Sequence, residues 1–138
     1  MKFLFSTKSN NSLNNLWLLI YRVALSAFML THGIPKLERL LSGSGGSFPD
    51  PLGVGSNLSL ILTVFGEVVA PVLVMVGFST RLSAVPVAFA MAVAAFVVHG
   101  ADPFARKELA LLFLLGFITI IVMGGGRYSL DTLLGKRR

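Results

Sequence analysis

The sequence predicts an all-α membrane protein: a bundle of four transmembrane helices with both termini in the cytoplasm. Hydrophobic residues make up 54% of the 138 residues and charged residues 13%, whereas a soluble domain carries roughly 25% charged residues. The mean hydropathy is +0.80, and four long apolar stretches alternate with short polar segments. We therefore expect lipid, not water, to surround most of this chain.

Each of the four apolar stretches is long enough to cross a membrane as a helix. Roughly 20 residues, at a rise of about 1.5 Å each, span the hydrocarbon core of a bilayer. The stretches hold 19, 21, 18 and 17 residues, so the last two only just reach this length. In order, they are Leu16–Ile34, Leu58–Phe78, Leu82–His99 and Leu109–Gly125.

The segments between the four spans predict how the helices are connected within a single domain, residues 1–138. Residues 79–81 form a tight turn, which makes the second and third helices antiparallel neighbours. Residues 100–108 form a short loop with an Asp-Pro turn signal. After the first span, residues 35–41 are predicted to form a short interfacial helix, followed by a flexible loop over residues 42–57, rich in Gly, Ser and Pro.

The distribution of Lys and Arg predicts the orientation in the membrane. Cytoplasmic segments carry an excess of these residues. Seven lie on the side of the two termini and four on the other side, which predicts a multi-pass protein of the inner (cytoplasmic) membrane. The seven are Lys2, Lys8, Arg81, Arg127, Lys136, Arg137 and Arg138, and the four are Lys36, Arg39, Arg106 and Lys107.

Composition also excludes several classes of function. The chain has no cysteine, which removes thiol nucleophiles, CxxC redox centres and Cys-ligated metals. It has no cluster of acidic residues that predicts a metal site. The net charge of +6 comes from residues at the ends of apolar segments, without a basic stripe interleaved with aromatics, so we expect no nucleic-acid partner.

Two charged residues inside the spans, Arg22 and Glu67, are the strongest functional signal. A charge at bilayer depth costs a few kcal/mol, so each should face the interior of the bundle and find a partner. In antiparallel helices the two lie about 9 Å and 16 Å from the cytoplasmic ends, which predicts a buried Arg22–Glu67 pair. Two interpretations remain open: a purely structural pair, or a pair that also serves a ligand or a proton path.

A second polar cluster is predicted on the opposite side of the membrane. At 100° per residue, Lys36 lies within about 40° of Arg22 on one face of the first helix, with His32 on its flank. His99 ends the third span and Glu108 precedes the fourth. These four residues would line the mouth of a cavity above Arg22 and Glu67. The alternative is that they are interfacial residues that contact water and lipid headgroups.

The order of these features resembles the DoxX-like family of small four-helix membrane proteins. The similar stretches are YRVALSAFMLTHGIPKL, GEVVAPVLVMVGFSTR and GGGRYSLD, and the resemblance covers about residues 16–134. In the last motif Gly125 stands where the family usually has Pro. The residues that match the family pattern are Arg22, Gly33, Lys36, Glu67, Gly77, Thr80, Arg81, Gly126, Arg127, Ser129 and Asp131.

The resemblance implies a role as a subunit or accessory of a quinone-linked oxidoreductase or of an oxidative-stress complex. Quinone is then the implied cofactor, and soluble or membrane redox subunits are the implied partners, besides the lipid bilayer. Redox activity would require such a complex or a bound quinone. Two alternatives remain: a small proton-coupled exporter that uses Glu67, and a non-catalytic membrane anchor or assembly subunit.

Overall fold

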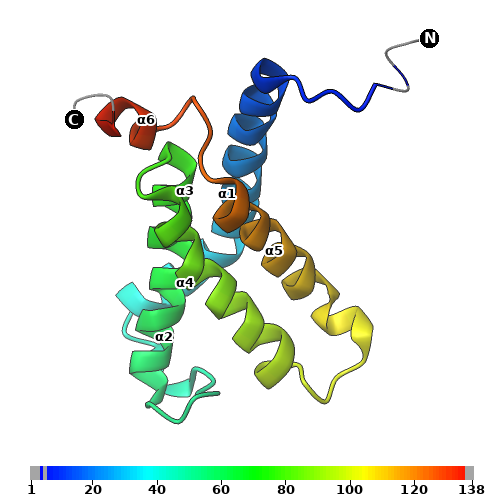
Figure 1. Ribbon diagram of the computed structural model, residues 1–138. Coiled ribbons are helices and arrows are strands. Elements are labelled where there is room, and N and C mark those ends of the chain that lie inside the picture. Colours follow the sequence, from blue (N-terminus) through cyan, green and yellow to red (C-terminus); the bar gives the residue numbers. More distant parts are fainter. Residues whose placement is uncertain (1–3, 5, 136–138) are drawn as a thin grey trace.

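In the computed structural model, which describes residue 4 and residues 6–135, every regular element of the described chain is a helix (Figure 1). The π-helical turn Phe65–Val69 joins α2 to α3 into one continuous helix, Ser56–Val76. A second π-helical turn, Ala94–Val98, extends α4 into the continuous helix Thr80–Val98. The elements are α1 (Asn11–Leu41), a 3-10 turn (Gly45–Ser47), α2 (Ser56–Val64), α3 (Ala70–Val76), α4 (Thr80–Val93), α5 (Phe104–Met123) and α6 (Leu130–Gly135).

Within the described residues, three helices have both the length and the composition to cross a membrane. They are Asn11–Leu41, Ser56–Val76 and Thr80–Val98. The fourth predicted span is also helical, but α5 begins with a charged segment, Arg106-Lys107-Glu108, which leaves an apolar part of only 15 residues, Leu109–Met123. The predicted all-helical fold is thus confirmed.

Helix α1 is longer at both ends than the predicted span Leu16–Ile34. It begins after Asn10, whose side-chain oxygen accepts hydrogen bonds from the amides of Ser12 and Leu13 and so caps the helix. It continues through Pro35 to Leu41. The separate interfacial helix predicted for residues 35–41 was therefore wrong, because the proline removes one hydrogen bond but does not end the helix.

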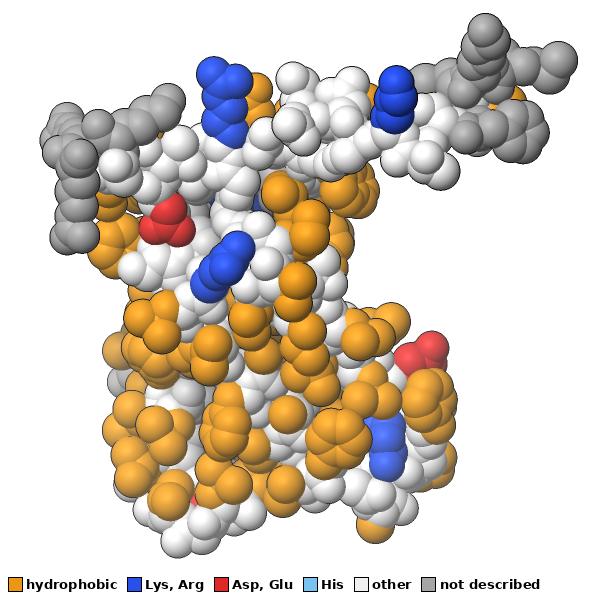
Figure 2. All heavy atoms as spheres, in the orientation of Figure 1, with side chains coloured by type: hydrophobic (Ala, Val, Ile, Leu, Met, Phe, Trp, Pro, Cys, Tyr) orange, Lys and Arg blue, Asp and Glu red, His pale blue; other side chains and the backbone are white. Residues whose placement is uncertain are grey.

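The helices pack around one apolar core. Helix α4 packs most extensively against α5, while α1 packs against α2, α3 and the π-helical turn between them. Hydrophobic side chains cover most of the helical body on the face shown in Figure 2, as expected for a surface in contact with lipid. The largest fully buried apolar side chains are Phe117, Met29, Leu60, Ile120, Val74 and Val87.

The two ends of the bundle differ in how they are built. One end holds both ends of the described chain, the turn between α3 and α4, and the segment that follows α5 (Figure 1). There the amide of Asp131 donates to the carbonyl of Gly77 at 2.9 Å. The other end holds the loop over residues 42–55 and the loop over residues 99–103. We call these the terminal end and the loop end.

Candidate functional site

A wedge-shaped groove lies between α2 and α4 in the described part of the molecule. A Cβ atom at Gly66 would lie 3.1 Å from the Cβ of Ala90 and 3.2 Å from the carbonyl oxygen of Pro86, so the helices touch there. From that contact they diverge toward the loop end (Figure 1). The groove between them has a volume of about 380 Å³, within the range of ligand pockets.

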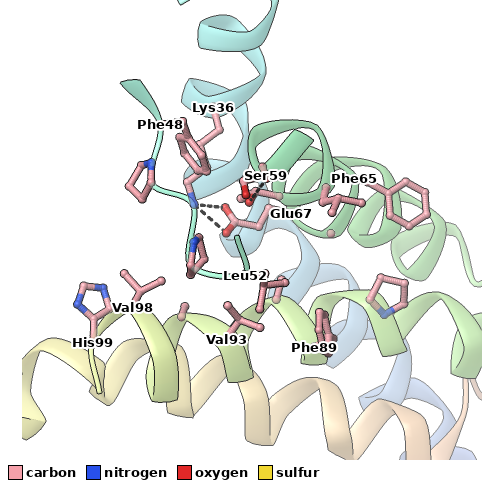
Figure 3. A pocket seen from close by; sticks show the side chains of 18 residues that line it. Lys36, Phe48, Leu52, Ser59, Phe65, Glu67, Phe89, Val93, Val98 and His99 are labelled. Atoms are coloured by element: carbon pink, nitrogen blue, oxygen red, sulfur yellow. Dashed lines mark hydrogen bonds and ion pairs between the residues drawn. The ribbon is translucent and has the colours of Figure 1, made fainter. Parts of the chain in front are cut away.

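The groove contains one ion pair, between Lys36 and Glu67 (Figure 3). The Nζ atom of Lys36 donates to both carboxylate oxygens of Glu67, at 2.7 and 2.6 Å. The side chain of Glu67 is 5% exposed and that of Lys36 is 33% exposed. The other side chains labelled in Figure 3 are mostly apolar, including Phe48, Leu52, Phe65, Phe89, Val93 and Val98.

The close approach of α1 to the helix Ser56–Val76 places Lys36 beside Glu67. Gly33 is buried, and a Cβ atom at this position would overlap the backbone carbonyl group of Glu67. Because glycine has no side chain, α1 can lie directly against this backbone. Lys36 follows three residues later on the same side of α1 and extends to the carboxylate. The family motif Gly-x-x-Lys therefore has a specific packing role here.

Glu67 lies in the middle of the π-helical turn Phe65–Val69. The amide of Ala70 donates to the carbonyl of Phe65, five residues back, and Pro71 follows without an amide hydrogen to donate to the carbonyl of Glu67. Single π-helical turns inside α-helices occur frequently at functional sites. The turn changes the direction in which Glu67 projects relative to a regular helix.

His99 lines the loop end of the groove and is held by Asp102. Nδ1 of His99 lies 2.8 Å from Oδ2 of Asp102, and this hydrogen bond is the main cause that lowers the pKa of the Asp102 carboxyl below its ordinary value. With Nδ1 donating to Asp102, Nε2 is the acceptor of a neutral ring. Sequence reasoning identified His99 but missed Asp102, although the spacing of three residues was visible.

The other two residues of the predicted cluster are outside this groove. His32 is exposed and packs edge-on against Phe113, with ring centroids 5.7 Å apart. Glu108 is exposed near the start of α5. Neither lines the cavity. The structure thus brings together Lys36, Glu67 and His99, but not all four predicted members of the cluster with Arg22.

The predicted Arg22–Glu67 pair was wrong. Arg22 is buried, but its guanidinium points to the terminal end, where it donates to the carbonyl oxygens of Met75, Gly125 and Tyr128. Glu67 instead takes Lys36 as its partner. The chain after α5 folds back over Arg22 and supplies backbone acceptors, which the spacing of charges along the sequence does not reveal.

Several of the remaining family residues form a second cluster, which we call the clasp: Gly77, Thr80, Ser129 and Asp131. Gly77 has a φ of +76° and ends α3, and a Cβ atom there would lie 2.5 Å from the Cβ of Ser129. Asp131 accepts hydrogen bonds from the amides of Ser79 and Thr80, at 2.6 and 2.8 Å, and from the hydroxyl of Thr80 at 2.7 Å. The clasp ties the segment that follows α5 to the start of α4.

Three further family residues lie around the clasp. Gly126 has a φ of +76°, which favours glycine. The amide of Arg127 donates to the side chain of Asn15 at 2.9 Å, and the Arg127 side chain is exposed. Arg81 is exposed beside Gly124. The matching residues at the terminal end therefore hold the fold together, whereas those at the groove surround a cavity.

Comparisons with known proteins identify the family. The sequence model of the DoxX family matches residues 17–100, more than half of the chain. The chain belongs to the DoxX family. The matched region of this DoxX protein includes Arg22, Lys36, Glu67 and His99 and ends before the segment 124–131. An uncharacterised protein of Haemophilus influenzae is 32% identical over 129 residues, covering 88% of this chain and 92% of the relative. No solved structure matches the DoxX chain.

Proposed function

We propose that this DoxX protein is a membrane subunit that binds the headgroup of a quinone in the groove between α2 and α4, and that it works with a soluble or membrane redox partner. The observation that carries the proposal is the Lys36–Glu67 ion pair inside an otherwise apolar cavity. Binding sites for small molecules combine mostly apolar walls with a few polar groups that fix orientation.

The polar groups of the groove fit the oxygen atoms of a quinone ring. An ammonium group has three hydrogens to donate, and Lys36 uses two hydrogen bonds for Glu67, so one remains for a ring oxygen. At the loop end, Nε2 of a neutral His99 is an acceptor, so it fits the hydroxyl group of the reduced ring and not a quinone oxygen. Phe48 and Phe89 supply aromatic surface along the groove. A bound quinone would supply two-electron redox chemistry, for which the chain has no cysteine or other group of its own.

The same ion pair argues against a proton-coupled exporter. Such an exporter requires a carboxylate that releases and takes up protons during transport. Both carboxylate oxygens of Glu67 already accept a hydrogen bond from Lys36, at 2.7 and 2.6 Å, so the carboxylate is engaged by a fixed partner. The geometry of Glu67 therefore suits a fixed role in positioning a ligand better than a role in carrying protons for transport.

We further propose that the chain lies in the inner membrane, crosses it four times and has both termini in the cytoplasm. Support comes from the clasp. Helix α4 leaves the terminal end at Thr80, and Asp131 bonds back to that same residue. Helix α5 must therefore return across the thickness that α4 has crossed. Arg106 is exposed and Lys107 donates to the carbonyl of Gly100 at 3.0 Å, so both charges lie at the loop end, where long basic side chains compensate for the short apolar part of α5.

The test is the quinone content of the purified protein, measured by solvent extraction and mass spectrometry. We expect near one quinone per chain in the wild type, and a loss of most of it in Glu67→Gln and in Lys36→Met. Glu38→Gln is the matched control, because Glu38 is an exposed carboxylate on the same end of α1. Absence of quinone from well-folded wild-type protein would contradict the proposal, and proton release from Glu67 driven by a substrate would favour export instead.

A further inference from the structure

The groove has an open side that consists of apolar residues. Leu62, Phe65 and Phe89 all line the cavity, and they are 49%, 46% and 60% exposed on the surface of the molecule. We call these three residues the portal. They come from the two helices that form the walls, α2 with its π-helical turn on one side and α4 on the other (Figure 3). A molecule outside the protein would meet the cavity at this opening.

The portal lies near the centre of the membrane. Phe65 is the tenth residue of the 21-residue helix Ser56–Val76, and Phe89 is the tenth residue of the 19-residue helix Thr80–Val98. At a rise of about 1.5 Å per residue, both lie about 13–14 Å from the first residue of their helix. That is close to half the thickness of a hydrocarbon core of about 30 Å. The portal therefore faces the acyl chains, not the headgroups or water.

The loop end of the groove is covered by residues 48–52, which we call the lid. Phe48 and Leu52 of the lid line the cavity. Asp50 fixes the lid because its carboxylate accepts from the hydroxyl of Ser59 at 2.7 Å, as well as from two backbone amides of the loop. Arg39 lies over the ring of Phe48, 5.5 Å from its centroid. The lid thus covers the loop end of the groove, where the carboxylate of Glu67 is 5% exposed, while the side chain of Lys36 remains 33% exposed.

We infer that the ligand of this groove is a lipid with a small uncharged polar head, which reaches the ion pair from the bilayer through the portal and not from water through the loop end. This inference rests on the proposed function and adds the route and the class of ligand. Moving a charged head to the depth of the portal has a large free-energy cost of desolvation. Phospholipid headgroups and free anions are therefore excluded, whereas an uncharged ring with a hydrocarbon tail can diffuse at this depth.

The polarity inside the groove agrees with this class of ligand. The ion pair is already neutral as a unit, so it attracts an uncharged group with hydrogen-bond acceptors more readily than an anion or a cation. The ligand tail would remain between Leu62 and Phe89, in contact with acyl chains outside. Such a ligand gains apolar burial in the groove without leaving the membrane.

The route can be tested without any quinone, because the natural chain has no cysteine. Single cysteines are introduced by Val93→Cys inside the groove, Phe96→Cys on the lipid-facing side of the same helix and Gly46→Cys in the loop, and each is labelled with bimane. In proteoliposomes, we expect phospholipids with brominated chains to quench the labels at positions 93 and 96, and aqueous iodide to quench only the label at 46. Quenching of the label at 93 by iodide would overturn the inference.

A second measurement separates this inference from the proposed function. Leu62→Trp narrows the portal, and Leu112→Trp places the same bulk on an exposed, lipid-facing position of α5. We expect retained quinone to fall several-fold in Leu62→Trp and to stay unchanged in Leu112→Trp. Equal retention in both variants would refute the route through the portal while leaving the quinone site intact. A wild type without quinone would refute the proposed function, and the bimane labels would still report the route.

Discussion

At the scale of single residues, the choice of partner for Glu67 determines what the groove can do. Sequence reasoning placed Arg22 and Lys36 on one face of the first helix, and Arg22 is indeed buried while Lys36 reaches into the groove. The pairing itself could not be predicted. Helical periodicity predicts the face on which a residue lies, but Arg22 and Lys36 are far apart along the helix. Tertiary structure brings different acceptors near them: backbone carbonyls near Arg22 and the Glu67 carboxylate near Lys36.

The difference in exposure between Lys36 and Glu67 predicts an unequal response to mutation. Lys36→Met leaves a carboxylate that is 5% exposed without a cation, whereas Glu67→Leu leaves a lysine that is 33% exposed and can turn toward water. Removing one partner of a buried pair costs about 3–5 kcal/mol, and replacing both is often nearly neutral. We expect Lys36→Met to lower the thermal unfolding temperature in detergent more than Glu67→Leu does, and the double variant Lys36→Met/Glu67→Leu to recover most of the loss.

Additive losses of stability in the single and double variants would contradict this prediction. If the double variant loses as much stability as the two single losses combined, Lys36 and Glu67 are not energetically coupled. A conservative control is Lys36→Arg, which keeps the positive charge and should remain closer to the wild type than Lys36→Met does.

At the scale of elements, the sequence predicted where most helices lie and missed how they are shaped. The spans predicted at Leu58–Phe78 and Leu82–His99 agree with Ser56–Val76 and Thr80–Val98 to within two residues at each end, because apolar runs bounded by polar residues mark helix ends well. The two π-helical turns were not predicted. An extra residue in one helical turn leaves no periodic signal in a largely apolar segment. Pro71 and Pro86 each remove an amide hydrogen from these helices, but a proline does not show where a π-helical turn lies.

The hydrogen bonds between the start of α4 and Asp131 also predict a dependence of stability on pH. Burial raises the pKa of Asp131, but hydrogen bonds from Thr80 and Ser79 and the nearby charge of Arg22 outweigh that effect, so the pKa is below its ordinary value. The ionised carboxylate therefore stabilises the fold above the ordinary carboxyl pKa of about 4. This stabilisation is lost as the pH falls through the lower pKa of the folded protein.

Asp131→Asn keeps one acceptor oxygen and removes the titrating group. We expect the variant to unfold at a lower temperature than the wild type at pH 7, with a loss on the order of 1 kcal/mol, as for other helix caps. Below pH 4 the two proteins should become more similar, because the wild type loses its ionised carboxylate there. The measurement is thermal unfolding in detergent between pH 7 and pH 3. A constant difference across this range would show that the charge of Asp131 does not contribute.

At the scale of the whole molecule, one end is held together by hydrogen bonds and the other contains the groove. The clasp and Arg22 draw the segment after α5 against α1 and the turn before α4, so three parts of the chain that are distant in sequence are joined at the terminal end. At the loop end α2 and α4 separate, and the lid fills part of the space. Rigidity at the terminal end allows the wedge to stay open, since the helices are fixed together where they converge.

The orientation of this asymmetric molecule is the last prediction, and it decides which compartment faces the lid. On the face shown in Figure 2, most Lys and Arg side chains lie toward the terminal end, in line with the seven-to-four distribution along the sequence. The end of a membrane protein that carries more Lys and Arg usually lies in the cytoplasm. We expect alkaline phosphatase fused after Arg138 to be inactive, and the same enzyme inserted at Gly53, an exposed position where a Cβ atom would meet nothing within 4 Å, to be active outside the cytoplasm. Activity of only the fusion after Arg138 would reverse the orientation and place the lid in the cytoplasm. Activity at both positions would instead mean that α5 does not return across the membrane.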